Sequence, residues 1–169
     1  MSTFTLTPAR KAFLATINWA EGSPAYNQLF NYVPFDNNGP HPNQIVSAGG
    51  YNSTAAGAYQ FLYSSWHDTI PLVPLNDYMS GPNQDQAALA RINWRKALDE
   101  IDNGNIQEAV EILSYEWASL PPGRYGQPIK SMEAVLSYYN DALATFNGSG
   151  AASTVSPVQY NADLKKKGR

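Results

Sequence analysis

Apolar residues recur every three or four positions near the start of the chain, a spacing that places them on one face of a helix. Thr7 followed by Pro8 is typical of a helix start, because Thr caps free N–H groups and Pro suits the first helical position. Gly22 is typical of a helix end. We therefore predict a helix from Pro8 to about Glu21. Its apolar face carries Phe13, Leu14, Ile17 and, at the last turn, Glu21.

The helical pattern stops between residues 26 and 52, where Asn, Gly and Pro separate short apolar pieces. This composition predicts irregular hairpins and loops. Helical spacing returns after Gly57, and we expect the second helix to begin at Tyr59-Gln60. Further helices are predicted from Ser80 to Ile101, either continuous or broken, from Ile106 to Trp117, and from Met132 to Leu143. The predicted fold class is α+β, mostly α, with a small irregular β-hairpin region between the first and second helices.

After Phe146 the sequence is rich in small and polar residues and ends in a basic run. Such a segment has few side chains to bury, so we expect a folded domain over residues 1–146 and a flexible C-terminal tail over residues 147–169. A tail of this kind is a tether to a larger particle, a basic patch for an anionic envelope, or an end without function.

The composition excludes several classes of protein. A net charge of −3 without a basic stripe argues against nucleic acid as a partner. The absence of cysteine excludes a thiol nucleophile and a cysteine zinc site, and two histidines rarely make a metal site alone. No apolar run suits membrane insertion or a signal peptide, so we expect synthesis in a cytoplasm. Eleven tyrosines favour sugar binding, because Tyr combines an apolar face with a polar tip.

Glu21 is the strongest candidate for chemistry. Burial beside apolar residues and the negative end of the helix dipole both disfavour its ionised form, so its pKa should be raised. A carboxyl group that stays protonated near neutral pH can act as a general acid. The alternative is an ordinary glutamate that reaches solvent from a helix end.

Two other segments carry candidate binding residues. Small residues precede Tyr59 and Gln60, and they would let a ligand approach the backbone of a helix start. A loop rich in Pro and Gly follows the helix that ends near Trp117, and it presents Tyr125 and Gln127. Each feature alone is common in proteins.

Taken together, five motifs are similar to those of the lytic transglycosylases of the phage lambda endolysin type. The motifs are RKAFLATINWAEG, YNQLFNYVPFDNNGPHPN, STAAGAYQFL, NQDQAALARI and SYEWASLPPGRYGQ, and they cover about residues 10 to 130. The resemblance implies a lysozyme-like fold and cleavage of the β-1,4 bond between N-acetylmuramic acid and N-acetylglucosamine in peptidoglycan. It also implies 1,6-anhydro products and no metal or other cofactor.

The resemblance assigns roles to individual residues. Glu21 in WAEG matches the single catalytic acid of the family. Tyr59 and Gln60 in GAYQ match a wall of the saccharide cleft, and Tyr125 and Gln127 in YGQ match the opposite wall. The sequence departs from the family at Asn27, where Asp is common, and at Ala58, where relatives carry Arg.

Three hypotheses about function remain open. A lytic transglycosylase needs Glu21 alone, whereas a hydrolytic muramidase usually needs a second carboxylate, for which Asp36 is the candidate, although its turn-like context favours local hydrogen bonds instead. The third is a virion-associated wall-penetrating or saccharide-binding component. We expect peptidoglycan glycan strands as the partner, a monomer when free, and location in the host cytoplasm before release to the periplasm and cell wall, or on the virion.

Overall fold

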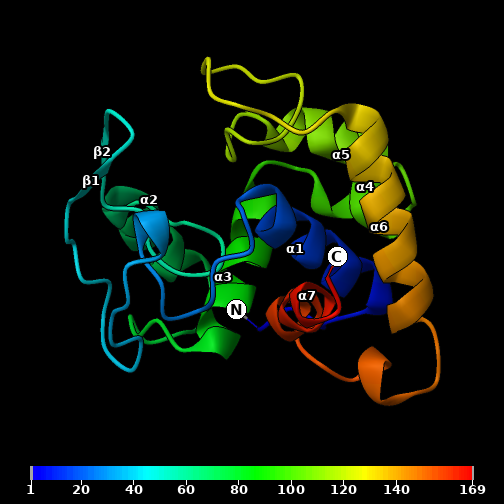
Figure 1. Ribbon diagram of the computed structural model, residues 1–169. Coiled ribbons are helices and arrows are strands. Elements are labelled where there is room, and N and C mark those ends of the chain that lie inside the picture. Colours follow the sequence, from blue (N-terminus) through cyan, green and yellow to red (C-terminus); the bar gives the residue numbers. More distant parts are fainter. Residues whose placement is uncertain (1, 169) are drawn as a thin grey trace. The chain divides into compact units, whose positions relative to one another are not determined.

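The computed structural model describes residues 2–168 and confirms the α+β, mostly α fold class (Figure 1). By contact the chain divides into two units, residues 2–4 with 24–90 and residues 5–23 with 91–168. The helices are α1 Pro8–Ala20, α2 Tyr63–Thr69, α3 Gly81–Trp94, α4 Leu98–Asp102, α5 Ile106–Leu113, α6 Met132–Phe146 and α7 Pro157–Lys166. Short 3-10 helices are η1 Phe30–Tyr32, η2 Ile70–Leu72 and η3 Ala151–Ser153, and the strands are β1 Val46–Ala48 and β2 Tyr51–Ser53. No helix among residues 2–168 is long and apolar enough to cross a membrane.

The predicted first helix is confirmed at both ends. Thr7 is the N-cap, and its Oγ1 accepts a hydrogen bond of 3.3 Å from the backbone N–H of Arg10. Glu21 is the C-cap, and Gly22 follows with a φ of 92°, a conformation that favours glycine. The sequence thus fixes where α1 stops, and with it the position of the Glu21 carboxyl group.

In the unit of residues 24–90, most of the chain between α1 and α2 is irregular, as predicted. The small sheet pairs β1 with β2 in antiparallel register, from Val46 opposite Ser53 to Ala48 opposite Tyr51. Gly49 and Gly50 make the turn with φ values of 58° and 84°. This is the predicted hairpin region between the first and second helices.

The second helix begins later than predicted. Residues 57–61 form a turn, and α2 begins at Tyr63. Ala56 and Phe61 exchange backbone hydrogen bonds of 3.0 and 2.9 Å, while Oε1 of Gln84 accepts from the N–H of Ala58 at 2.9 Å. Because these partners satisfy the backbone outside a helix, Tyr59 and Gln60 lie in a tight turn.

In the unit of residues 5–23 and 91–168, α1 is the central element and packs against α4, α6 and α7 (Figure 1). The segment predicted as helix between Ser80 and Ile101 forms two helices, α3 and α4, and Lys96 between them has a φ of 65°. Glu116 lies in the segment after α5. Its side chain is buried and accepts hydrogen bonds from Arg91 at 2.7 Å and Arg95 at 2.8 Å. Paired in this way, the buried carboxylate holds the segment after α5 to the end of α3.

The prediction of a flexible tail over residues 147–169 is wrong for the part of the tail that the structure describes. Ser156 caps α7 by accepting a hydrogen bond of 3.0 Å from the N–H of Gln159, and Val158 and Tyr160 are buried. Nδ2 of the buried Asn161 donates to the carbonyl oxygen of Ala15 and to Oδ1 of Asn18, both at 2.8 Å. The helix α7 therefore packs against α1, and the hydrogen bonds of Asn161 are part of this contact, which a count of apolar residues misses.

Candidate active site

Glu21 is half-buried at the C-terminal end of α1. Its Oε1 accepts a hydrogen bond of 2.8 Å from Oγ of Ser119, a residue 98 positions later in the chain. Trp117 and Leu120, on either side of Ser119, are both buried and fix this segment. The carboxyl group is therefore held in place by a single neutral donor.

The pKa of Glu21 is raised to about 7. Desolvation by burial raises the pKa, and the hydrogen bond from Ser119 lowers it by a smaller amount. The upward direction expected from the sequence is confirmed. A carboxyl group with this pKa is partly protonated and partly ionised at neutral pH, so it can both give and accept a proton there.

The end of α1 is restrained on more than one side. Trp19 stacks on Tyr138 of α6 with ring centroids 4.3 Å apart and an interplanar angle of 6°. Nζ of Lys165 in α7 donates to the carbonyl oxygens of Gly22 at 3.4 Å and Ser23 at 3.3 Å. These contacts come from two different helices and surround the backbone that carries Glu21, so its side chain is presented from a rigid support.

The loop of residues 119–130 is closed at its base. The N–H of Lys130 donates to the carbonyl oxygen of Ser119 at 3.2 Å, and Nζ of Lys130 lies 4.8 Å from the ring centroid of Trp19. One end of the loop thus contacts Glu21 and the other contacts α1. The loop itself carries Tyr125 and Gln127, so the sequence-predicted acid and these two binding candidates share one connected piece of structure.

Tyr125 and Gln127 are both exposed, as a role in binding requires. Tyr125 is 56% exposed, and its hydroxyl donates to the carbonyl oxygen of Tyr115 at 3.0 Å. Arg124 lies over the ring of Tyr115 at 3.7 Å and donates to Oγ of Ser114 at 2.8 Å. These contacts tie the loop back to the segment after α5, and the Tyr125 side chain stays exposed.

The prediction that Tyr59 contacts substrate is wrong for its side chain. Tyr59 is fully buried, and its hydroxyl donates to Oδ1 of Asp85 at 2.6 Å. Tyr26 donates to the same carboxylate at 2.8 Å. Gln60 is half-buried with a φ of 51°, and its Nε2 donates to the carbonyl oxygen of Gly57 at 2.8 Å. In this turn Gln60 stays a candidate for contact with a ligand, whereas Tyr59 holds the turn in place.

Asp36 has the local role that its sequence context indicated. The side chain is exposed, and Oδ1 accepts a hydrogen bond of 2.9 Å from the N–H of Asn38, two residues later. This is the geometry of an Asx turn. Asp36 therefore has a structural task that explains its presence without catalysis.

Residues 11–146 match the sequence model of the family described as Endolysin. This chain belongs to the endolysin family. It is 33% identical over 146 residues to the endolysin of Escherichia phage lambda, a match that covers 80% of this chain and 92% of that protein. It is 34% identical over 122 residues to the endolysin of Escherichia phage P2, with 72% of each chain covered.

Solved structures agree with the sequence match. A structure of bacteriophage lambda lysozyme complexed with a chitohexasaccharide aligns with a TM-score of 0.76 and 31% identity, over 82% of this chain and 96% of that one. Another structure, of lysozyme from bacteriophage lambda, aligns with a TM-score of 0.67 and 28% identity, over 83% and 93% of the two chains. The endolysin thus has a lysozyme-like fold and is a phage-type enzyme that cleaves peptidoglycan.

Sequence reasoning missed Ser119 and the pair formed by Asp85 and Tyr26. Ser119 lies in the quoted WASLP motif, but nothing local to a loop serine shows that it faces a carboxyl group 98 residues away. Asp85 lies in the quoted NQDQ motif, and its position among buried neighbours on α3 was the available signal. Ser119 holds the carboxyl group of Glu21, and Asp85 holds the side chain of Tyr59.

Proposed function

We propose that this endolysin is a lytic transglycosylase that cleaves the β-1,4 bond between N-acetylmuramic acid and N-acetylglucosamine. The observation that carries the proposal is the Glu21 carboxyl group, whose pKa of about 7 suits both halves of an acid–base cycle. In the first half, neutral Glu21 protonates the glycosidic oxygen as its bond to C1 of the muramic residue breaks. In the second half, the Glu21 carboxylate accepts the proton of the C6 hydroxyl as that oxygen bonds to C1.

This cycle is balanced without a second carboxylate or water. One C–O bond breaks, one forms, and Glu21 returns to its neutral state. The attacking hydroxyl belongs to the same sugar as C1, so its effective concentration exceeds that of water. Hydrolysis would instead need a base or nucleophile, and the candidate Asp36 accepts a hydrogen bond in its own turn.

Ser119 determines which oxygen of Glu21 carries the proton. Because Oγ of Ser119 donates to Oε1, the proton of the neutral acid lies on Oε2. Oε2 is then the oxygen that serves the glycosidic bond. The exposed side chains of Tyr125 and Gln127, together with Gln60, are the proposed saccharide contacts. The chitohexasaccharide in the lambda lysozyme structure supports a glycan as ligand.

The proposed setting follows from the phage-type family. We infer that the enzyme works as a monomer on glycan strands, with neither nucleic acid nor membrane insertion involved. It is made in the host cytoplasm and reaches the periplasm and cell wall on release. The alternative is a virion-associated protein attached to a phage particle through the C-terminal segment of residues 147–169.

Product analysis tests the reaction. Purified peptidoglycan is digested and the muropeptides are measured by mass spectrometry, with Glu21→Gln as the inactive control. The expected products are lighter than hydrolysed muropeptides by the mass of one water and have no reducing ends. Reducing ends that accumulate in step with solubilisation would make the enzyme a muramidase, and Asp36→Asn would be the next variant.

A further inference from the structure

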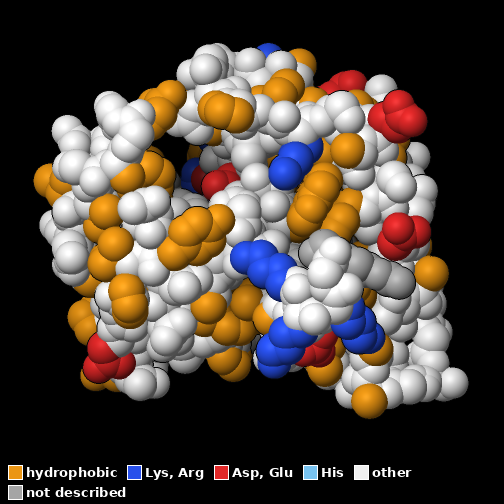
Figure 2. Space-filling model, viewed as in Figure 1, with side chains coloured by type: hydrophobic (Ala, Val, Ile, Leu, Met, Phe, Trp, Pro, Cys, Tyr) orange, Lys and Arg blue, Asp and Glu red, His pale blue; other side chains and the backbone are white. Residues whose placement is uncertain are grey.

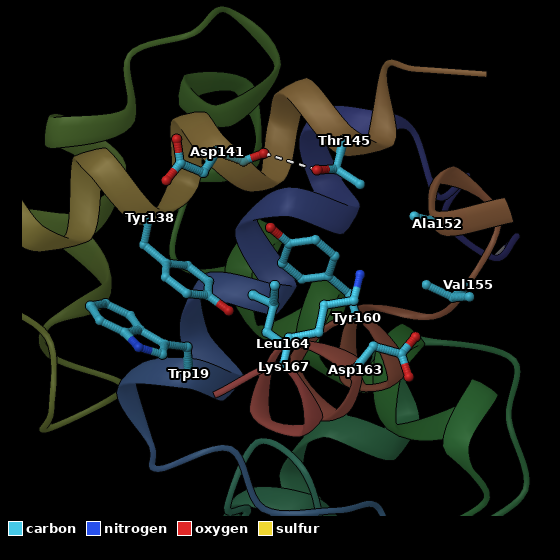
Figure 3. A pocket seen from close by; sticks show the side chains of 10 residues that line it. All are labelled: Trp19, Tyr138, Asp141, Thr145, Ala152, Val155, Tyr160, Asp163, Leu164 and Lys167. Atoms are coloured by element: carbon cyan, nitrogen blue, oxygen red, sulfur yellow. Dashed lines mark hydrogen bonds between the residues drawn. The ribbon is translucent and has the colours of Figure 1, made fainter. Parts of the chain in front are cut away.

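A cavity of about 620 Å³ lies among α6, η3 and α7, with Trp19 of α1 in its wall (Figure 3). Its lining combines aromatic, aliphatic and charged side chains, among them Tyr138, Asp141, Val155, Tyr160, Asp163 and Lys167. A second cavity of about 260 Å³ shares Trp19 and Tyr138 with it and adds Lys130 and Lys165. Part of this lining comes from α7, which lies beyond the residues matched to the family.

The aromatic rings of this cavity are poorly placed for a sugar, which needs an exposed ring face. One face of Trp19 is stacked on Tyr138, and the ammonium group of Lys130 lies 4.8 Å from the same ring. Tyr160 is only 7% exposed and packs against Phe146. The rings therefore act as apolar walls instead of stacking platforms.

The charged groups are better placed to meet a ligand. Figure 3 shows Lys167 directed from α7 toward α6 and the carboxylate of Asp163 near the side of Val155. Within residues 2–168, neither the Asp141 carboxylate nor the Lys167 ammonium group has an ion pair or side-chain hydrogen bond. Asp163 accepts one hydrogen bond, from Gln159 at 2.8 Å. The cavity thus offers both signs of charge beside small apolar walls.

Lysine side chains gather around α7, where Figure 2 shows Lys and Arg groups beside hydrophobic ones. The last turn of α7 holds Lys165 and Lys166, and Lys167 is its C-cap. Because only Lys167 of these three lines the larger cavity, its two neighbours provide the local positive field without forming the cavity wall.

We propose that this cavity binds the peptide that branches from the muramic residues of peptidoglycan. That peptide carries carboxylates for Lys167, a free amino group for Asp141 and Asp163, and alanine-sized side chains for the wall formed by Val155. The inference rests on the proposed peptidoglycan substrate. Trp19, part of the cavity wall, lies two residues before Glu21, at the same end of α1. Peptide and catalytic acid thus meet the same rigid helix.

A peptide site of this kind raises the affinity for peptide-bearing strands and leaves the chemical step unchanged. The expected signature is a lower KM for peptidoglycan than for glycan strands stripped of peptide, at similar kcat. Substitutions in the cavity raise the KM for the peptide-bearing substrate alone.

The experiment uses the full chain and the tripeptide L-Ala-γ-D-Glu-diaminopimelate as probe, followed by amide NMR shifts and calorimetry. The tripeptide should shift amides of residues 138–145 and 155–167. Lys167→Glu should weaken binding about tenfold, whereas Lys166→Glu, the same charge change one residue earlier and outside the cavity lining, should leave it nearly unchanged.

Several results overturn the proposal. They are the absence of shifts at these amides, equal loss of binding in both lysine variants, or shifts at the same amides with chitotetraose but not with the tripeptide, which would make the cavity a saccharide subsite. The outcome is separable from that of the proposed function. Stripped glycan strands report on cleavage by Glu21, and the tripeptide titration reports on the cavity even in an enzyme that cleaves nothing.

Discussion

Asp85 and Glu21 are both carboxyl groups with little access to water, one in each unit of the chain, and their surroundings differ. Asp85 is 4% exposed and receives hydrogen bonds from Tyr59 at 2.6 Å and from Tyr26 at 2.8 and 3.0 Å. Glu21 is half-buried and receives one, from Ser119. Asp85 thus has several hydrogen-bond donors around its carboxylate, whereas the carboxyl group of Glu21 has a single donor.

The difference shows how one chain uses buried acids for two purposes. Several donors stabilise the ionised form, so the Asp85 cluster joins α3 to the turn at Tyr59 and to Tyr26 as a structural unit. A single neutral donor does not offset the loss of water around Glu21, so its pKa rises to about 7. A shortage of hydrogen bonds, which would be a defect in a structural site, is what makes a proton available for catalysis.

The largest expected effect that separates the two sites is the loss of activity in Glu21→Gln. The amide keeps the shape of the side chain but cannot transfer the proton, and general acid–base catalysis contributes roughly 10²–10⁴-fold. Clearing of a peptidoglycan suspension should slow by at least about 100-fold, with an unchanged circular dichroism spectrum. Activity within threefold of the parent enzyme would remove Glu21 from the mechanism.

The same substitution should stabilise the fold at high pH. The pKa of Glu21 is raised from 4.5 to about 7 on folding, so the native state holds a proton that the unfolded chain releases between these values. Stability from this group is present below pH 4.5 and is lost as pH rises to about 7. The free energy of unfolding of Glu21→Gln, measured relative to that of the parent, should therefore rise by up to about 3 kcal/mol from pH 4 to pH 8. Denaturant unfolding at both pH values measures it, and an equal difference at both would contradict the shift.

Two Tyr→Phe variants sharpen the contrast from the structural side. Tyr59→Phe removes a buried donor to Asp85, so it should lower the free energy of unfolding by about 1.5–3 kcal/mol while cleavage per folded molecule stays near normal. Tyr125→Phe removes an exposed hydrogen bond to a carbonyl group and should change stability by less than about 0.5 kcal/mol. Chemical denaturation of both variants tests this. Equal losses in the free energy of unfolding would mean that the Asp85 cluster stabilises the fold no more than an exposed hydrogen bond does.

The smallest expected effect concerns the one donor to Glu21. The hydrogen bond from Ser119 lowers the pKa of Glu21, so Ser119→Ala should raise it and move the alkaline fall of activity to higher pH by less than about one pH unit. Initial cleavage rates between pH 5 and pH 9 measure the shift. Ser137→Ala, on an exposed face of α6, is the control and should leave the profile in place. A shift to lower pH in Ser119→Ala would contradict the assigned contact.

The features that could be predicted from the sequence are those that depend on residues close together in the chain. The start of α1 at Thr7-Pro8, its end at Gly22 and the position of Glu21 on its apolar face follow from local capping and spacing. The resemblance then gave the family and the lysozyme-like fold. The raised pKa of Glu21 was predictable because its place on the apolar face predicts burial, and burial raises the pKa of a carboxyl group.

What could not be predicted depends on residues far apart. Tyr59 was expected at a binding surface because small residues precede it and GAYQ resembles the family motif. Its buried partner Asp85 lies 26 residues away, so nothing local indicated its burial. Gln84, on the same helix as Asp85, holds the turn that stands in place of the predicted helix start. The helix α7 was not predicted because the segment has few apolar residues and its contact with α1 uses the polar side chain of Asn161. Ser156-Pro157 repeats the Thr7-Pro8 signal and could have revealed it.

The packing of α7 on α1 has a consequence for how the protein can be cut or rebuilt. The family match ends at residue 146, and a chain shortened to that residue would keep every motif by which the enzyme is recognised. It would also remove Tyr160, which packs against Phe146 of α6, and it would leave the carbonyl group of Ala15 without the donor that Asn161 provides. For this enzyme the family match ends before the folded chain does, so a fusion partner belongs after Lys167, the C-cap of α7.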